Sequence, residues 1–92
     1  MEATGQLVTL GVTIQNRLGL HARPAMAFVD TANKFTCDIK VSKAGQSVDG
    51  KSIMQMMMLA ATQGTVLQIE AKGPDAAQAV EAIKQLVDRK FD

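Results

Sequence analysis

The sequence predicts an α+β fold in which three helices cover one face of a four-stranded, mainly antiparallel sheet. Four segments alternate apolar and polar residues, which is the period of a strand with one buried face. Three other segments repeat apolar residues at the helical period of about 3.6. Their order is βαββαβα, with short connections and no linker-like stretch. The apolar faces of the strands and of the helices are both buried when the helices pack on one face of the sheet, so we expect an open-faced β-sandwich.

The first two elements are a strand over residues 8–14 and a helix from Ala22 to about Asn33. The apolar positions of the strand are Val8, Leu10, Val12 and Ile14. Those of the helix are Ala22, Ala25, Met26, Val29 and Ala32. Asn33-Lys34 then gives a stop signal.

A hairpin follows the first helix. Phe35, Cys37, Ile39 and Val41 alternate with polar residues and predict a second strand. The pair Ala44-Gly45 turns the chain into a short third strand around residues 46–49.

The second half of the chain adds a helix, a strand and a last helix. Ser52 is a preferred N-cap type, and the helix that it starts should end near Gln63-Gly64. A fourth strand is predicted over residues 65–71. The break at residues 73–75 starts a last helix with its apolar stripe at Ala76, Val80, Ile83 and Val87.

Composition excludes several classes of protein. Residues 1–92 should form a single domain, and a net charge of +1 gives no electrostatic drive toward nucleic acid. The chain has no Trp or Tyr and only three Phe, so few aromatic side chains could stack on nucleic-acid bases. The sequence also gives no indication of a polar-lined ligand pocket. One cysteine and one histidine leave no metal cluster, no cofactor is implied, and the pair supplies no complete catalytic set. No signal peptide or membrane span is apparent, so we expect a cytoplasmic protein without membrane insertion.

His21 is the only histidine, and it directly precedes the first predicted helix. Proline is favoured in the first helical turn, so Pro24 places His21 at or just before the N-cap. The free amides of Ala22 and Arg23, the helix dipole and the Arg23 guanidinium then form a receptor for a phosphoryl group. This pattern predicts that His21 carries a phosphoryl group.

The local charge suits this role. Arg17 and Arg23 bracket His21, and the sequence has no acidic residue between Glu2 and Asp30. Position alone also allows a helix-capping histidine without chemistry and a merely solvated arginine at 23. Pro24 would start the helix in either case.

The second helix is apolar on nearly every side. One stripe must fill the core, so the other, represented by Ile53, Met54 and Met57, is expected to stay exposed as a docking patch. The alternative is that this helix is more deeply buried, with methionine as filler.

Two motifs carry a resemblance to a known family. Gly19-Leu20-His21-Ala22-Arg23-Pro24-Ala25 and Gly50-Lys51-Ser52-Ile53-Met54 resemble the HPr phosphocarrier family of the bacterial phosphotransferase system. Gln63-Gly64-Thr65 and Lys72-Gly73-Pro74-Asp75 resemble the same family, so the likeness spans nearly the whole chain.

The resemblance implies a relay rather than an enzyme. Enzyme I, charged by phosphoenolpyruvate, would phosphorylate His21 at Nδ1, and an enzyme IIA domain would then receive the phosphoryl group. The expected form is a monomer.

The resemblance also suggests regulation. Family members with this context at Ser52 are phosphorylated by an HPr kinase/phosphorylase, and a transcriptional regulator would be a further partner; a simple N-cap is the alternative for Ser52. Leu18 and the run Met56-Met57-Met58-Leu59 resemble nitrogen-related paralogues. A sugar-transport carrier, a nitrogen-type carrier and a mainly regulatory HPr-like binding protein therefore all stay open.

Overall fold

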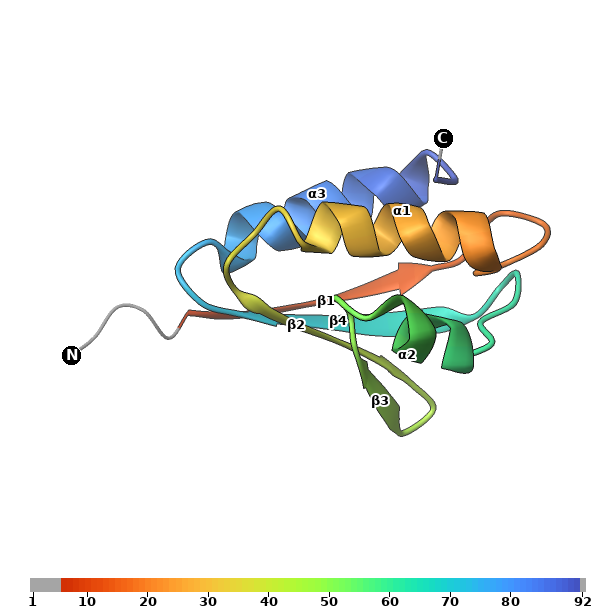
Figure 1. Ribbon diagram of the computed structural model, residues 1–92, viewed down its shortest axis with the longest axis horizontal. Coiled ribbons are helices and arrows are strands. Elements are labelled where there is room, and N and C mark those ends of the chain that lie inside the picture. Colours follow the sequence, from red (N-terminus) through yellow and green to blue (C-terminus); the bar gives the residue numbers. More distant parts are fainter. Residues whose placement is uncertain (1–5, 92) are drawn as a thin grey trace.

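The computed structural model describes residues 6–91 and has the predicted βαββαβα order (Figure 1). Its elements are β1 (Leu7–Thr13), α1 (Ala22–Ala32), β2 (Asp38–Lys43), β3 (Gln46–Asp49), α2 (Ile53–Met58), β4 (Val66–Lys72) and α3 (Ala76–Asp88). The strands form one sheet in the order β1-β4-β2-β3, and each neighbouring pair is antiparallel. The predicted fold class is confirmed.

The helices pack against the sheet to enclose the core. Figure 1 shows α1 and α3 side by side along one face of the sheet, and α3 contacts both β1 and β4. The short helix α2 contacts α1 and β3. β4 alternates exposed and buried residues along its whole length, and its buried Leu67, Ile69 and Ala71 meet fully buried Phe28 and Ile83 in one hydrophobic cluster. The opposite sheet face is left to solvent, as an open-faced sandwich requires.

The end of α2 differs most from the sequence prediction. The helix stops at Met58 and not near Gln63-Gly64, because Ala60 adopts a positive φ of 50° that ends the helical path. The Lys43 ammonium donates a 2.8 Å hydrogen bond to the Leu59 carbonyl, one of the carbonyls left without a partner at the end of the helix. The sequence pattern does not reveal this contact, because Lys43 lies far from α2 along the chain. Because α2 ends at Met58, the chain that follows it is extended enough to contact the loop before α1, where the Ala61 carbonyl accepts from the Leu20 amide.

The second strand also begins later than the alternation from Phe35 suggests. The amides of Thr36 and Cys37 donate to the Asp75 carboxylate, at 2.8 Å to Oδ2 and 2.9 Å to Oδ1. These two donors are therefore used by a side chain and not by a sheet ladder, and β2 starts at Asp38. The other strand ends fall within one residue of prediction, which is the usual spread at element ends.

Asp75 thus ties the start of α3 to the chain between α1 and β2. The Thr36 amide is the main cause that holds the pKa of the Asp75 carboxyl below its usual value, with smaller contributions from Cys37. Burial, followed by contact with Asp75, raises the pKa of the Cys37 thiol. The pair is a carboxylate and a neutral thiol at neutral pH.

We expect Asp75→Asn to lower the stability of the fold at pH 7. An asparagine side chain offers one oxygen, so its amide nitrogen would face one of the two backbone N–H donors. Because the folded-state pKa is lowered, the stabilisation is complete above the unfolded-state value of about 3.9 and is lost as the pH falls through the lower folded-state value. Urea midpoints of wild type and variant should therefore differ at pH 7 and converge toward pH 2. Asp30→Asn, at an exposed carboxylate on α1, is the control; equal midpoints for Asp75→Asn and wild type at pH 7 would refute this account.

Candidate functional site

The loop between β1 and α1 presents His21 at the protein surface. His21 is the N-cap residue of α1, with an extended backbone (φ −80°, ψ −169°), and its side chain makes no capping hydrogen bond. The residue is exposed, whereas Leu20 before it is buried in the core. The buried Leu20 anchors the backbone, and the neighbouring imidazole stays accessible from solvent.

Hydrogen bonds hold this loop against the chain that follows α2. The Leu20 amide donates to the Ala61 carbonyl at 2.8 Å, and the Gly19 amide donates to the Asn16 carbonyl at 3.1 Å. The Asn16 side-chain amide closes the same turn by donating to the Gly19 carbonyl at 2.6 Å. Gly19 itself has a φ of +68°, a conformation that glycine adopts without a steric penalty.

The first turn of α1 offers unused donors next to the imidazole. The first intrahelical bond runs from the Ala25 amide to the His21 carbonyl, at 3.0 Å, so the amides of Ala22 and Arg23 have no acceptor within the helix. Pro24 has no N–H and is buried beneath them. The first turn also carries no acidic residue. Such a helix start attracts anions, because its free amides and the helix dipole point the same way.

A shallow hollow of about 310 Å³ lies over this helix start. It is lined by Asn16, Arg17, Leu18, His21, Arg23, Pro24, Lys90 and Phe91. The lining contains three cationic side chains and, among residues 6–91, no carboxylate. Sequence analysis expected Arg17 and Arg23 here, and the structure places both beside His21. It did not find Lys90 and Phe91, which come from the far end of the chain.

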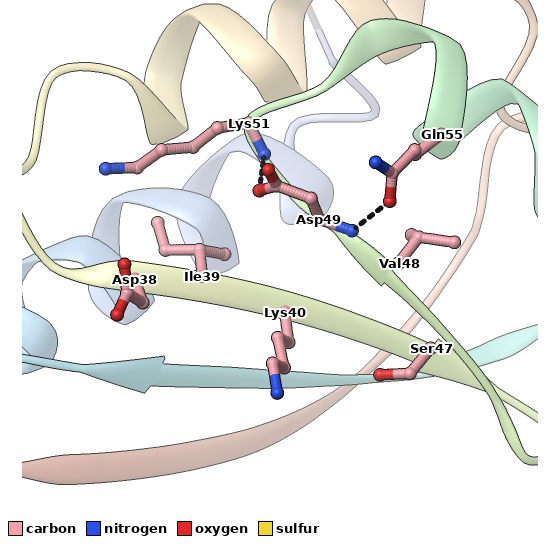
Figure 2. Close-up of a pocket in the computed structure, with 8 residues that line it drawn as sticks. All are labelled: Asp38, Ile39, Lys40, Ser47, Val48, Asp49, Lys51 and Gln55. Carbon is pink, nitrogen blue, oxygen red and sulfur yellow. Dashed lines mark hydrogen bonds between the residues drawn. The ribbon is translucent and has the colours of Figure 1, made fainter.

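Ser52 caps α2, as predicted. Its hydroxyl accepts a 3.3 Å hydrogen bond from the Gln55 amide, and the Gln55 side-chain oxygen accepts one of 2.9 Å from the Asp49 amide. The Asp49 carboxylate in turn accepts from the Lys51 amide at 2.9 Å. Figure 2 shows Asp49 between Lys51 and Gln55, at the edge of a hollow of about 510 Å³ between β2, β3 and the start of α2. The start of α2 is thus fixed independently of any ligand.

The apolar surface of α2 is divided as the docking interpretation requires. Met56 and Leu59 are fully buried, whereas Met54 and Met57 are 76% and 45% exposed. Ile53 lies between these extremes, since it is partly buried and packs against the core. Met58 is 66% exposed and was not among the predicted contacts. We call Met54, Met57 and Met58 the methionine patch.

Two other exposed apolar residues lie on the loop before α1 and on α1 itself. Leu18 is 68% exposed and lines the hollow over His21, and Met26 is 52% exposed on α1, the helix that contacts α2. Clusters of exposed apolar side chains are typical of surfaces that bind other proteins. No helix within residues 6–91 combines the length and apolarity needed to cross a bilayer. The same residues contain no group of three His, Cys, Asp or Glu side chains placed to bind a metal ion.

The model of the family described as the PTS HPr component phosphorylation site matches residues 8–89. Phosphocarrier protein HPr of Pseudomonas aeruginosa is 45% identical over 84 residues, covering 90% of this chain and 93% of the relative. The crystal structure of HPr-C-His from Thermoanaerobacter tengcongensis is similar with a TM-score of 0.89 and 43% identity, covering 91% of this chain and 94% of that one. Fold and matches together define a phosphocarrier of the phosphotransferase system. The chain belongs to the HPr family, whose members carry phosphoryl groups and are not themselves catalysts.

A further structure from T. tengcongensis bears on oligomeric state. It is described as an HPr dimer and is similar with a TM-score of 0.76 and 44% identity, covering 88% of this chain and 93% of that one. The monomer expected for the present chain therefore stays a prediction.

Proposed function

We propose that this protein accepts a phosphoryl group on His21 from phosphoenolpyruvate-charged enzyme I and passes it to an enzyme IIA domain. The observation that carries the proposal is the exposed imidazole at the start of α1, where the amides of Ala22 and Arg23 are free and no carboxylate lies in the first turn. A cytoplasmic, monomeric carrier is the form in which such a small domain would meet several partners in succession.

The chemistry requires a neutral imidazole nitrogen as nucleophile. Its lone pair attacks the phosphorus of the donor, a nitrogen–phosphorus bond forms, and the donor leaves with the electrons of the broken bond. A helix N-terminus favours this course because its free amides and its dipole stabilise the dianionic phosphoryl group of the product. The family resemblance assigns the attack to Nδ1.

The surrounding residues have separate roles in this proposal. The amides of Ala22 and Arg23 donate to the phosphoryl oxygens, and the Arg23 guanidinium supplies a mobile counter-charge. Arg17 adds positive charge from the preceding loop. Pro24 orders the first turn without offering a donor. Because the site is open to solvent, the phosphoryl group is held and can still be surrendered to the next acceptor.

The direct test is incubation with phosphoenolpyruvate and enzyme I. One acid-labile, base-stable phosphoryl group should be added per chain, as expected for a phosphorus–nitrogen bond. A panel of IIA domains from sugar and nitrogen branches then identifies the acceptor. No labelling by enzyme I would refute the carrier proposal and favour a mainly regulatory binding protein.

The methionine patch is the proposed docking surface, together with the exposed edge of Ile53. We expect Met54→Glu to weaken the complex with enzyme I at least about tenfold, because tenfold corresponds to about 1.4 kcal/mol and an unpaired carboxylate desolvated at an interface costs at least that much. The fold should be unaffected, since this side chain is 76% exposed. Calorimetric titration with enzyme I gives the dissociation constant.

Leu7→Glu is the matched control for that experiment. Leu7 is 55% exposed and lies at the start of β1, at the end of the strand remote from the His21 loop. Equal weakening by both variants, or loss of folding in Met54→Glu alone, would show that the patch is not a docking surface.

Ser52 is the proposed regulatory site, modified by an HPr kinase/phosphorylase, with a transcriptional regulator as a partner of the modified form. A phosphate at this position would add a charge of about −1.5 to −2 at the start of α2 and next to Met54. The added charge would favour the helix locally and oppose docking of the apolar patch.

We expect Ser52→Asp to lower the rate of phosphotransfer from enzyme I about tenfold, because an uncompensated charge would have to be desolvated at the interface. Ser52→Asn is the control, since asparagine and aspartate are comparable N-caps and differ here in charge. Initial rates of labelling at limiting carrier concentration measure the effect. An unchanged rate in Ser52→Asp would count against regulation at this residue.

A further inference from the structure

The C-terminal end of α3 closes with a Schellman motif. The Phe91 amide donates to the Leu86 carbonyl and the Lys90 amide to the Val87 carbonyl, both at 2.9 Å. This is the six-to-one and five-to-two pattern of that motif, with Arg89 as the C-cap residue. Phe91 also packs partly against the core, as the residue in its position commonly does.

Lys90 occupies the position of this motif where glycine is preferred. Its φ is +57°, in the left-handed region that penalises any residue with a Cβ atom. Phe91 follows with a φ of +65°. A strained backbone persists where the surrounding structure imposes it, and such residues cluster at functional sites.

The effect of these two residues is to turn the chain end toward the start of α1. Lys90 and Phe91 line the same hollow as His21, Arg17 and Arg23. Figure 1 shows α3 alongside α1, with the C-terminal end of α3 on the same side as the loop that leads into α1. Among residues 6–91, the hollow contains no carboxylate that would compete for the Lys90 ammonium.

We propose that Lys90 is a phosphate-binding residue, whose ammonium contacts the phosphoryl group carried on His21. The proposal rests on the proposed function and adds a third cation, from a different element, to the two arginines. Those arginines approach from the loop before α1 and from its first turn, whereas Lys90 approaches from the end of α3. The dianion is thereby bound between two helices and not by one helix start alone.

A purely structural role for Lys90 predicts a different outcome. A lysine after a helix can interact favourably with the negative end of the helix dipole, and it would then act on stability only. The two accounts separate in Lys90→Gly. Glycine relieves the left-handed strain, so the midpoint of thermal unfolding should be unchanged or higher, whereas the ability to hold the phosphoryl group should fall.

The experiment measures the equilibrium constant for phosphoryl transfer between phosphorylated enzyme I and the carrier. This constant depends on the free end states and not on how well the partners dock. We expect Lys90→Gly to shift the equilibrium about two- to fivefold against the phosphorylated carrier at low salt, the size expected for one exposed ion pair. Lys90→Arg should restore it, and the shift should disappear near 1 M salt, where the Debye length is about 3 Å.

Lys34→Gln is the matched control. Lys34 is an exposed lysine just beyond the opposite end of α1, about 20 Å from His21 along the direction of the helix axis. The inference fails if wild type is labelled at His21 and Lys90→Gly has the same transfer equilibrium as Lys34→Gln. Failure of wild type to accept a phosphoryl group refutes the proposed function itself, and the inference with it.

Discussion

Replacing His21 by alanine is expected to reduce phosphoryl acceptance from enzyme I to background. His21 is the only histidine in the chain, so no second imidazole can replace it as nucleophile. The fold should persist, because the side chain is exposed and makes no capping bond. A surface substitution of this kind changes the free energy of unfolding by no more than about 0.5 kcal/mol. Labelling with phosphoenolpyruvate and enzyme I, beside a thermal melt, measures both quantities.

Arg23→Gln is the informative companion to that variant. It keeps the nucleophile and removes one counter-charge, so phosphorylation should be slowed but not abolished. Undiminished labelling of His21→Ala would show that another residue is the acceptor. Unfolding of His21→Ala would show that the imidazole supports the structure in a way that its exposed position does not suggest.

Gly19→Ala is expected to destabilise the fold by about 2–5 kcal/mol and to displace His21. A Cβ atom at this position would lie 2.3 Å from the Ala61 carbonyl oxygen and 2.9 Å from the Thr62 Cα. Both are backbone atoms and cannot rotate away as a side chain would. The clash falls where the Leu20 amide meets the same Ala61 carbonyl, two residues from the nucleophile. Urea unfolding gives the free energy, and the initial rate of labelling reports on His21.

Gly45→Ala is the matched control for this variant. Gly45 also has a positive φ, of 88°, but a Cβ atom there would meet nothing within 4 Å. It should therefore show only the left-handed penalty of about 1–2 kcal/mol and normal phosphorylation. Equal losses of stability in the two variants would mean that the loop before α1 yields to the added methyl group.

The fold was predictable because local and global signals agree along most of the chain. Alternating residues in β1 and β4 specified one buried face, and Pro24 located the start of α1. The errors lie where distant parts of the chain compete for a backbone group. The end of α2 depends on Lys43, and the start of β2 depends on Asp75, contacts that no window of neighbouring residues contains.

The candidate site divides in the same way. His21, Ala22, Arg23 and Pro24 are consecutive, so helix-start chemistry was enough to group them. Lys90 lies 69 positions after His21 in the sequence. Only the packing of α3 beside α1 brings it to the hollow over the start of α1. A lysine at a position that favours glycine was the one local signal, and it becomes visible only once the end of α3 is known.

The hydrogen bond from the Leu20 amide to the Ala61 carbonyl joins the reactive loop to the segment that leaves α2. This bond therefore links the proposed nucleophile to the proposed docking surface through the backbone. In the proposed relay, a partner that docks on the methionine patch would also set the direction from which its phosphorus approaches the His21 ring. Much of the translational and rotational entropy that orienting the two proteins costs would then be lost when they bind, before the phosphoryl transfer itself begins.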